Sequence, residues 1–163
     1  MTVMPPPTTF FSANLLIQII DTRFAAMVLY ARTWNVGAAE DIVQEALLKL
    51  LDQKKTPENP VAWLYKTIRN EAISGHRRAL SRQKHETEAV RQKTDWFSEK
   101  DALIAKEAAE KLEKLPPEQR EVVVLRIWGQ LSFDEIAELT QAPKTSVYRM
   151  YTESLATLRR QLS

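Results

Sequence analysis

Apolar residues recur every three or four positions along most of the chain, which is the spacing of one face of an α-helix. In the segment 11–33 the residues with this spacing are Leu16, Ile19, Ile20, Phe24, Met27, Val28 and Ala31. Asn35-Val36-Gly37 then ends the segment, and a second one with the same periodicity covers residues 38–51. No useful length of sequence alternates apolar and polar residues as a half-buried β-strand would. The pattern predicts an all-α fold.

A third helix is predicted to begin at Asn59-Pro60, since Asn is a favoured N-cap residue and Pro fits the first helical position. It extends to about Arg82, and its expected inward residues are Trp63, Leu64, Ile68 and Ala72. The segment 81–95 has almost no apolar residues, which is typical of a linker. We therefore expect two small helical domains joined by a flexible linker, with bounds 1–82, 83–97 and 98–163.

The C-terminal part contains further helix start and stop signals. Ser98 and Asp101 resemble a capping box, which predicts a helix that ends before Pro116-Pro117. The two prolines begin the next helix, over residues 118–128, and Gly129 is its expected C-terminal cap.

Two short helices in the last third of the chain predict a helix-turn-helix. The first covers residues 131–139, with a capping box from Ser132 to Glu135. After a turn, Thr145 or Ser146 is expected to cap the final helix. In this geometry the second helix can enter a DNA major groove, and an ordinary helical hairpin that binds no DNA is the alternative. The outward residues at the start of the final helix are Lys144, Ser146, Tyr148, Arg149 and Thr152.

Composition excludes several classes of protein. The 163 residues include no Cys, which excludes disulfides, thiolate metal sites and a cysteine nucleophile. The two isolated histidines, His76 and His85, make a poor metal site. No carboxylate pair or nucleophile constellation stands out, so we expect no enzyme, cofactor or metal. The sequence shows no signal peptide and no continuous apolar run of about 18 residues, so we expect a cytoplasmic protein without membrane insertion.

Charge is unevenly distributed, although the net charge is only +2. Basic residues are outnumbered by acidic ones in residues 1–52, and the reverse holds in residues 53–92. A neutral-to-acidic first third followed by a basic middle favours one surface for a protein partner and another for phosphate. A solvated helix face is the alternative that charge alone leaves open.

Three motifs together resemble a known family. Residues 115–122 (LPPEQREV), followed by residues 131–137 (LSFDEIA), resemble the C-terminal promoter-reading domain of extracytoplasmic-function sigma factors of the sigma-70 superfamily. Residues 39–46 (AEDIVQEA) resemble the polymerase-binding helix of the same family, and residues 59–72 (NPVAWLYKTIRNEA) resemble its next helix. The motifs occur in the family's order and cover nearly the whole chain.

The resemblance implies a protein that binds core RNA polymerase and directs it to promoters, held inactive by an anti-sigma factor until a signal arrives. No small-molecule substrate is implied. Docking on the polymerase clamp would use an exposed acidic face, as a basic partner surface requires. The residues of this face are Asp41, Gln44 and Glu45. Helix capping and solvation are their alternative roles.

The basic middle of the chain would hold the melted minus-ten element of the promoter. An opened strand needs cations for its phosphates and a planar group or pocket for an extruded base. Tyr65 is the expected exposed aromatic residue, whereas the spacing of Trp63 with Ile68 favours a core position for the indole. The expected contacts are Lys54, Lys55, Asn59, Tyr65, Lys66, Arg69, Asn70, Arg77 and Arg78.

The helix-turn-helix would read the minus-thirty-five element as duplex, through Lys144, Thr145, Ser146, Tyr148, Arg149 and Thr152. The guanidinium of Arg149 suits guanine or phosphate oxygens. Compared with the family, the final helix has few basic residues, which predicts weaker and less salt-dependent DNA binding. Gln141 stands where the turn usually carries Gly, at a cost of about 1 kcal/mol if that position is left-handed.

Two other functions fit part of the sequence. A sigma-like decoy would sequester an anti-sigma factor without reading DNA, and the weakly basic last helix favours it. A conventional helix-turn-helix repressor would bind duplex DNA alone, but the polymerase-docking motif argues against it. Promoter-specific transcription with core polymerase distinguishes a sigma factor from both.

Overall fold

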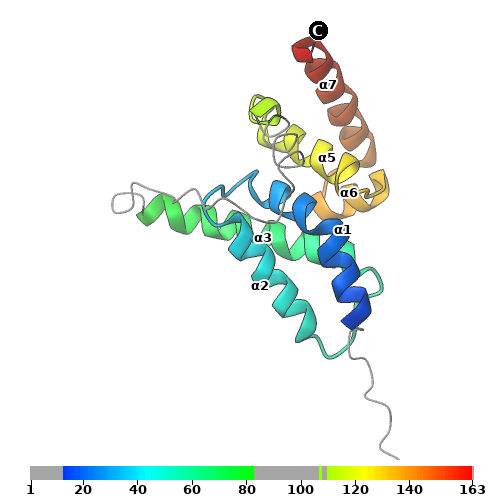
Figure 1. The fold of residues 1–163 in the computed structure, drawn as a ribbon. Helices are drawn as coiled ribbons and strands as arrows, with labels where there is room; N and C mark the ends of the chain where they lie inside the picture. The colour runs from blue at the N-terminus through cyan, green and yellow to red at the C-terminus, as the bar shows by residue number, and fades with distance from the viewer. Residues whose placement is uncertain (1–12, 83–106, 108–109, 163) are drawn as a thin grey trace, which may run out of the picture.

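The computed structural model describes residues 13–82, 107 and 110–162. Its helices are α1 (Ala13–Ala31), α2 (Ala39–Leu51), α3 (Pro60–Arg82), α5 (Pro117–Ile127), α6 (Phe133–Thr140) and α7 (Lys144–Leu162) (Figure 1). All regular secondary structure in the described residues is helical, which confirms the all-α class. The expected linker, residues 83–97, and the expected capping box of Ser98 and Asp101 lie outside the described residues.

Helices α1, α2 and α3 pack against one another in the N-terminal half (Figure 1). Their inward faces supply large side chains with almost no exposed area, namely Met27, Tyr30, Val43, Leu50, Leu64, Tyr65 and Ile68. The predicted cap of α3 is confirmed, because Asn59 Oδ1 accepts a hydrogen bond from the Ala62 amide at 3.1 Å. Near the surface, Lys49 Nζ lies 2.6 Å from Glu71 Oε1 and joins α2 to α3.

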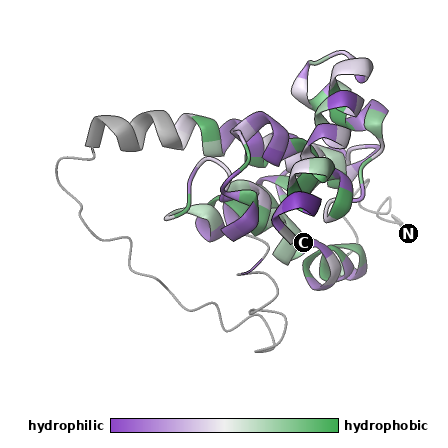
Figure 2. Cartoon of the chain, turned by 90° about the horizontal axis from the view of Figure 1, so that it is seen from above, coloured by the Kyte–Doolittle hydropathy of each residue, from purple (hydrophilic) through white to green (hydrophobic). Residues whose placement is uncertain are grey.

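By its length and composition, α1 could also cross a membrane. In the structure, however, α1 supplies Met27, Tyr30 and Ala31 to the core, while its exposed side carries Asp21 and Thr22. Figure 2 shows hydrophobic and hydrophilic residues mixed along the described helices. Packing against α2, α3 and α5 therefore accounts for the apolar composition of α1.

Helices α6 and α7 form the predicted helix-turn-helix, with α5 packed against both. The capping box of α6 is confirmed: Ser132 Oγ accepts a hydrogen bond from the Glu135 amide at 3.1 Å, and Glu135 Oε1 accepts one from the Ser132 amide at 3.0 Å. The expectation that Thr145 or Ser146 caps the last helix is wrong. Helix α7 already begins at Lys144, because the carbonyl of the preceding proline accepts a hydrogen bond from the Val147 amide at 3.0 Å.

The N-terminal and C-terminal halves share one continuous core. Helix α1 contacts α5, and α3 contacts α6. The cluster of buried side chains includes Met27 and Ile68 from the N-terminal half together with Val123, Leu125 and Ile136 from the C-terminal half. The two halves therefore lie directly against each other, with α5 beside α1 and α6 beside α3 (Figure 1).

The end of α5 uses its glycine differently from the expectation. The left-handed residue after the helix is Gln130, with φ of 57°, and not Gly129. Gly129 is instead required because there is no room for a side chain at this position. A Cβ added there would lie 2.6 Å from the Leu125 carbonyl oxygen and 3.2 Å from Cζ of Tyr65 on α3. The glycine lets the end of α5 approach α3 closely.

We predict that Gly129→Ala destabilises the fold by about 1–3 kcal/mol, because the crowded Leu125 carbonyl belongs to the backbone and cannot move aside freely. Urea denaturation followed by circular dichroism measures the change in unfolding free energy. Gly75→Ala in α3 is the matched control, because its Cβ would meet only the side-chain amide of Asn35, at 3.3 Å. Equal destabilisation by both substitutions would contradict the close approach at Gly129.

Candidate nucleic-acid and polymerase interfaces

The outward face of α2 is acidic, as predicted. Asp41, Gln44 and Glu45 are all exposed, while Val43 and Ala46 on the opposite side have no exposed area. The N-terminal position of Asp41 in α2 also places its carboxylate at the positive end of the helix dipole. The structure thus leaves this face open to a partner.

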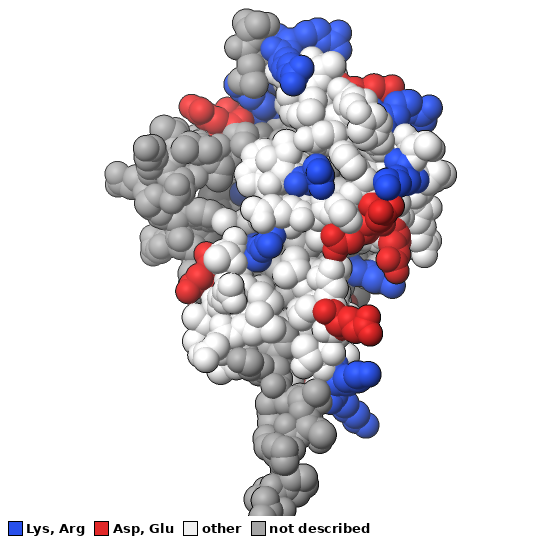
Figure 3. Space-filling view, turned by 90° about the vertical axis from the view of Figure 1, so that its right-hand side faces the viewer, with Lys and Arg blue, Asp and Glu red and all other residues white. Residues whose placement is uncertain are grey.

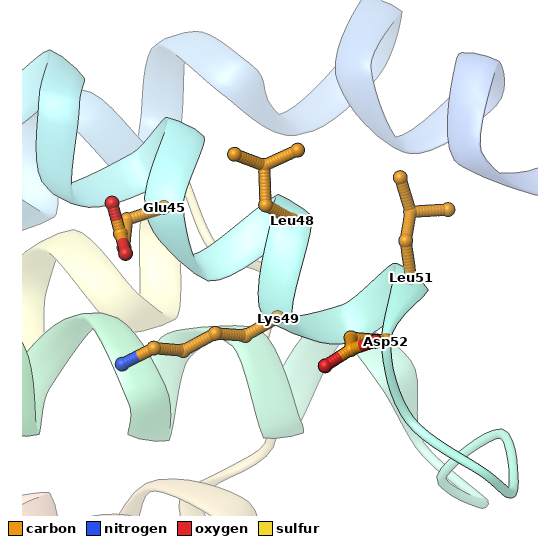
Figure 4. Close-up of a pocket in the computed structure, with 5 residues that line it drawn as sticks. All are labelled: Glu45, Leu48, Lys49, Leu51 and Asp52. Atoms are coloured by element: carbon orange, nitrogen blue, oxygen red, sulfur yellow. The ribbon is translucent and has the colours of Figure 1, made fainter.

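The acidic face of α2 continues into exposed apolar residues that sequence reasoning missed. Leu48 and Leu51 are 63% and 46% exposed. With Glu45, Lys49 and Asp52 they line a shallow hollow (Figure 4). Exposed leucines beside carboxylates are typical of a surface that binds another protein.

The predicted minus-ten residues fall into two groups in the structure. Lys54, Lys55, Lys66 and Asn70 are exposed. Asn59 is also exposed, but its Nδ2 donates a hydrogen bond to Glu135 Oε2 of the C-terminal half at 2.6 Å. Side chains of the last two expected residues, Arg77 and Arg78, lie outside the described part of the structure.

The expectation that Tyr65 is an exposed aromatic residue is wrong. Its side chain has no exposed area and makes an edge-to-face contact with Tyr30, with ring centroids 5.3 Å apart. Tyr65 lies one residue after Leu64 and three before Ile68, so it shares the inward face of α3, and the end of α5 covers it. Burial raises the pKa of its phenol well above the ordinary range. Trp63, which was expected in the core, lies half-buried at its edge.

Arg69 pairs with a buried carboxylate of the C-terminal half. Its Nε lies 2.5 Å from Oε1 of Glu121 on α5, and this glutamate is only 3% exposed. The Tyr30 hydroxyl donates a second hydrogen bond to the same oxygen at 2.7 Å. The guanidinium also lies 5.7 Å from the ring centroid of Trp34. Sequence periodicity gave no sign of this group, because its members come from three different helices.

The electrostatics of this group follow from burial and from one negative charge. Burial opposes the charge of Arg69, but the hydrogen bond and the negative charge of Glu121 outweigh it and raise the pKa of the guanidinium. The pKa of Tyr30 is raised by burial and by the same carboxylate. Arg69 is therefore a fixed cation and Tyr30 a fixed hydrogen-bond donor over the physiological pH range.

Helix α7 presents most of its predicted polar residues outward. Lys144, Thr145, Tyr148, Arg149 and Thr152 are exposed, and Ser146 is partly buried. The Lys144 ammonium lies 3.0 Å from Asp134 Oδ1 of α6, at a well exposed position where an ion pair contributes little. Figure 3 shows basic and acidic side chains intermixed on one side of the molecule.

An aromatic cluster holds the start of α7 on α6. The ring of Phe133 makes edge-to-face contacts with Tyr148 and Tyr151, at centroid distances of 5.5 and 5.3 Å. The guanidinium of Arg126 from α5 lies 4.5 Å from the Phe133 ring centroid and makes a cation–π contact with the ring. These contacts fix the orientation of Tyr148, which is 56% exposed, and of the outward residues beside it.

Within the described residues, no group of three His, Asp or Glu side chains could hold a metal ion. Outside α2, a second surface hollow is lined by residues from the end of α1, from the segment before α5 and from α5, namely Leu29, Arg32, Thr33, Leu112, Glu113, Arg120 and Val124. Arg120 is engaged there, since its guanidinium donates to the carbonyls of Leu112, Glu113 and Leu115.

Comparison with known proteins shows the family of this chain. The model of the family Sigma-70 region 2 matches residues 23–82, and that of Sigma-70, region 4 matches residues 105–158. The chain is 30% identical over 126 residues to the RNA polymerase sigma factor SigV of Bacillus subtilis, covering 71% of this chain and 72% of SigV. The chain belongs to the sigma-70 family, among the extracytoplasmic-function (ECF) sigma factors. It therefore binds core RNA polymerase and directs transcription initiation at specific promoters.

A second relative is the ECF RNA polymerase sigma factor SigW of Bacillus subtilis, 29% identical over 149 residues, covering 82% of this chain and 80% of SigW. Two solved structures share the fold. One is the sigma factor RpoE of Bartonella quintana in complex with the anti-sigma factor NepR, with a TM-score of 0.65, 20% identity and coverage of 93% and 98%. The other is CnrH in complex with the cytosolic domain of CnrY, with a TM-score of 0.59, 19% identity and coverage of 93% and 90%.

The turn before α7 carries a strained residue in this sigma factor. Gln141 adopts φ 57° and ψ 35°, a left-handed conformation that costs a residue with a side chain about 1 kcal/mol. We predict that Gln141→Gly stabilises the fold by about 0.5–1 kcal/mol, as measured by urea denaturation. Gln130→Gly, at the other left-handed position, should act in the same direction. Loss of stability in both variants would contradict the assignment of strain.

Proposed function

We propose that this sigma factor separates its two tasks between two surfaces. The exposed face of α2 docks on the clamp of core RNA polymerase, and α3 with α7 contacts the promoter. The observation that carries the first assignment is the exposure of Asp41, Gln44 and Glu45 on the side of α2 opposite to its buried residues. Such a face complements a basic surface and would accelerate encounter with it.

The apolar end of α2 supports the same assignment. Charge complementarity alone gives specificity and association rate more than affinity. Leu48 and Leu51 add exposed apolar area beside Glu45 (Figure 4). A partner that covers this area removes it from water, which favours binding. We infer that the docking surface extends from Asp41 to Leu51 along one side of α2.

We assign the promoter surface of α3 by its exposed basic residues and that of α7 by the fit of a helix to the DNA major groove. We infer that Lys54, Lys55, Lys66 and Asn70 contact the phosphates of the opened minus-ten strand, since all four are exposed at or near α3. The outward residues of α7 are placed to enter the major groove of the minus-thirty-five element, with Arg149 among the residues nearest the bases or phosphates. The scarcity of basic residues on α7 leads us to expect a shallow salt dependence there.

We also infer that the protein acts in the cytoplasm, where its polymerase acts, and that it has no catalytic activity of its own. An anti-sigma factor is the proposed regulator. This inference is supported by the fold shared with RpoE and CnrH, whose solved structures contain NepR and CnrY.

Charge reversal on α2 tests polymerase docking. We predict that Asp41→Lys weakens binding to core RNA polymerase about tenfold, a change of about 1.4 kcal/mol, because it places a like charge against a basic surface. Fluorescence anisotropy of the labelled sigma factor, titrated with core polymerase, measures the dissociation constant.

Asp21→Lys is the matched control, since it makes the same charge change at an exposed position on α1. It should bind polymerase like the wild type. Equal loss of affinity in both variants would mean that overall charge, and not the α2 face, determines binding.

A further inference from the structure

Tyr148 is the most exposed large hydrophobic side chain of the described C-terminal half, at 56%. It lies in the second turn of α7, directly before Arg149. Both side chains point away from the protein, whereas Val147 and Ser154 on the inward side of the helix have no exposed area. In a helix-turn-helix, residues near the start of the second helix reach the base edges of the major groove. Tyr148 therefore lies among the residues that the proposed function brings to the bases.

The Tyr148 ring packs against the aromatic cluster at the start of α6. Its centroid lies 5.5 Å from that of Phe133, at an interplanar angle of 75°. Phe133 is held in turn by Tyr151, at a centroid distance of 5.3 Å, and by the guanidinium of Arg126, at 4.5 Å. An edge-to-face pair favours one orientation, and a tyrosine has only two side-chain torsions to fix. The exposed ring is thus presented to a ligand with little further loss of conformational freedom.

The base edges in the major groove offer one kind of apolar group. They present hydrogen-bond donors and acceptors, and the only methyl group among them is the C5-methyl of thymine. An aromatic ring recognises this methyl group by apolar contact, which a guanidinium such as that of Arg149 does poorly. Thr145 and Thr152 also carry a methyl group, but each has far less apolar area than the Tyr148 ring. Of the outward residues of α7, Tyr148 is therefore the best suited to a thymine.

The charge of α7 gives a second reason for an apolar contact with the bases. Its outward basic residues near the start of the helix are Lys144 and Arg149, and the Lys144 ammonium lies 3.0 Å from Asp134 Oδ1. Few phosphate contacts leave a larger share of the binding to the base edges. A base that covers the exposed ring removes apolar area from water, which contributes affinity that salt does not screen.

We propose that Tyr148 is a specificity-determining residue, which selects a thymine in the minus-thirty-five element through contact between its ring and the C5-methyl group. The inference rests on the proposed placement of α7 in the major groove. It adds the base that one side chain prefers and the atom by which that base is recognised. The contact does not need the Tyr148 hydroxyl, so a phenylalanine at this position serves equally.

Deoxyuridine isolates the methyl group, because it lacks the C5-methyl of thymidine and still pairs with adenine. The probe is a synthetic duplex copy of a promoter that this protein directs in run-off transcription. Each thymine of its upstream element, on either strand, is replaced in turn by deoxyuridine. The dissociation constant is measured with core RNA polymerase and the full chain. We expect one replacement to weaken binding about fourfold, as the loss of one buried methyl group does, and the others to have little effect.

Three variants test whether Tyr148 makes the contact. Tyr148→Ala should weaken binding to the thymine duplex and bind the critical deoxyuridine duplex equally well, whereas Tyr148→Phe should keep the fourfold difference. Thr152→Ala is the matched control, since it truncates another exposed side chain of α7. It should also keep the fourfold difference between the two duplexes, whatever its own effect on affinity. Circular dichroism, together with binding to core polymerase without DNA, identifies any variant that is misfolded.

The ways in which this inference can fail are distinguishable from failure of the proposed function. If no deoxyuridine replacement affects the wild type, or if Tyr148→Ala remains as sensitive as the wild type, Tyr148 does not select thymine, and α7 keeps its proposed role. A Tyr148→Phe variant that behaves like Tyr148→Ala would mean that the hydroxyl makes the contact, which also overturns the inference. If scrambling the whole upstream element leaves binding unchanged, α7 does not read DNA, and the inference falls together with that part of the proposed function.

Discussion

A single buried carboxylate joins three helices from the two halves of this sigma factor. Glu121 is almost fully removed from water, and a charge in that environment is tolerated only where hydrogen bonds and an opposite charge replace the lost solvent. Tyr30 on α1 and Arg69 on α3 supply them. Because the three groups come from three helices, the pairing of this carboxylate and the packing of α5 against α1 and α3 are one requirement.

The surfaces that result differ in whether the C-terminal half covers them. Helix α2 packs on α1 and α3 and makes no extensive contact with α5, α6 or α7 in the described residues, so its acidic and apolar face is open (Figure 1). The face of α3 with Asn59 and Arg69 is covered by the C-terminal half. The proposed polymerase docking through α2 therefore leaves the contacts between the two halves in place.

The sequence was sufficient to predict most features that depend on neighbours along the chain, although it placed the cap of α7 after the observed start of that helix at Lys144. Helical periodicity, the Asn59 cap and the capping box of Ser132 and Glu135 act within one turn, and the structure confirms each of them. The motifs likewise predicted the family that the comparisons show. What failed depended on packing between distant segments. Tyr65 was expected outside because the sequence favoured Trp63 for the core; in the structure Tyr65 lies inward, against Tyr30 of α1 and the end of α5. The role of Gly129 as a contact point depends on the approach of α5 to α3, which sequence patterns do not reveal.

Run-off transcription with purified core RNA polymerase and a library of genomic fragments tests the central claim most directly. The account predicts discrete new start sites that share upstream elements when this protein is added, and none with core polymerase alone. Binding to polymerase without any new transcript would contradict promoter recognition and favour a sigma-like decoy. Absence of binding to polymerase would contradict the assigned function itself.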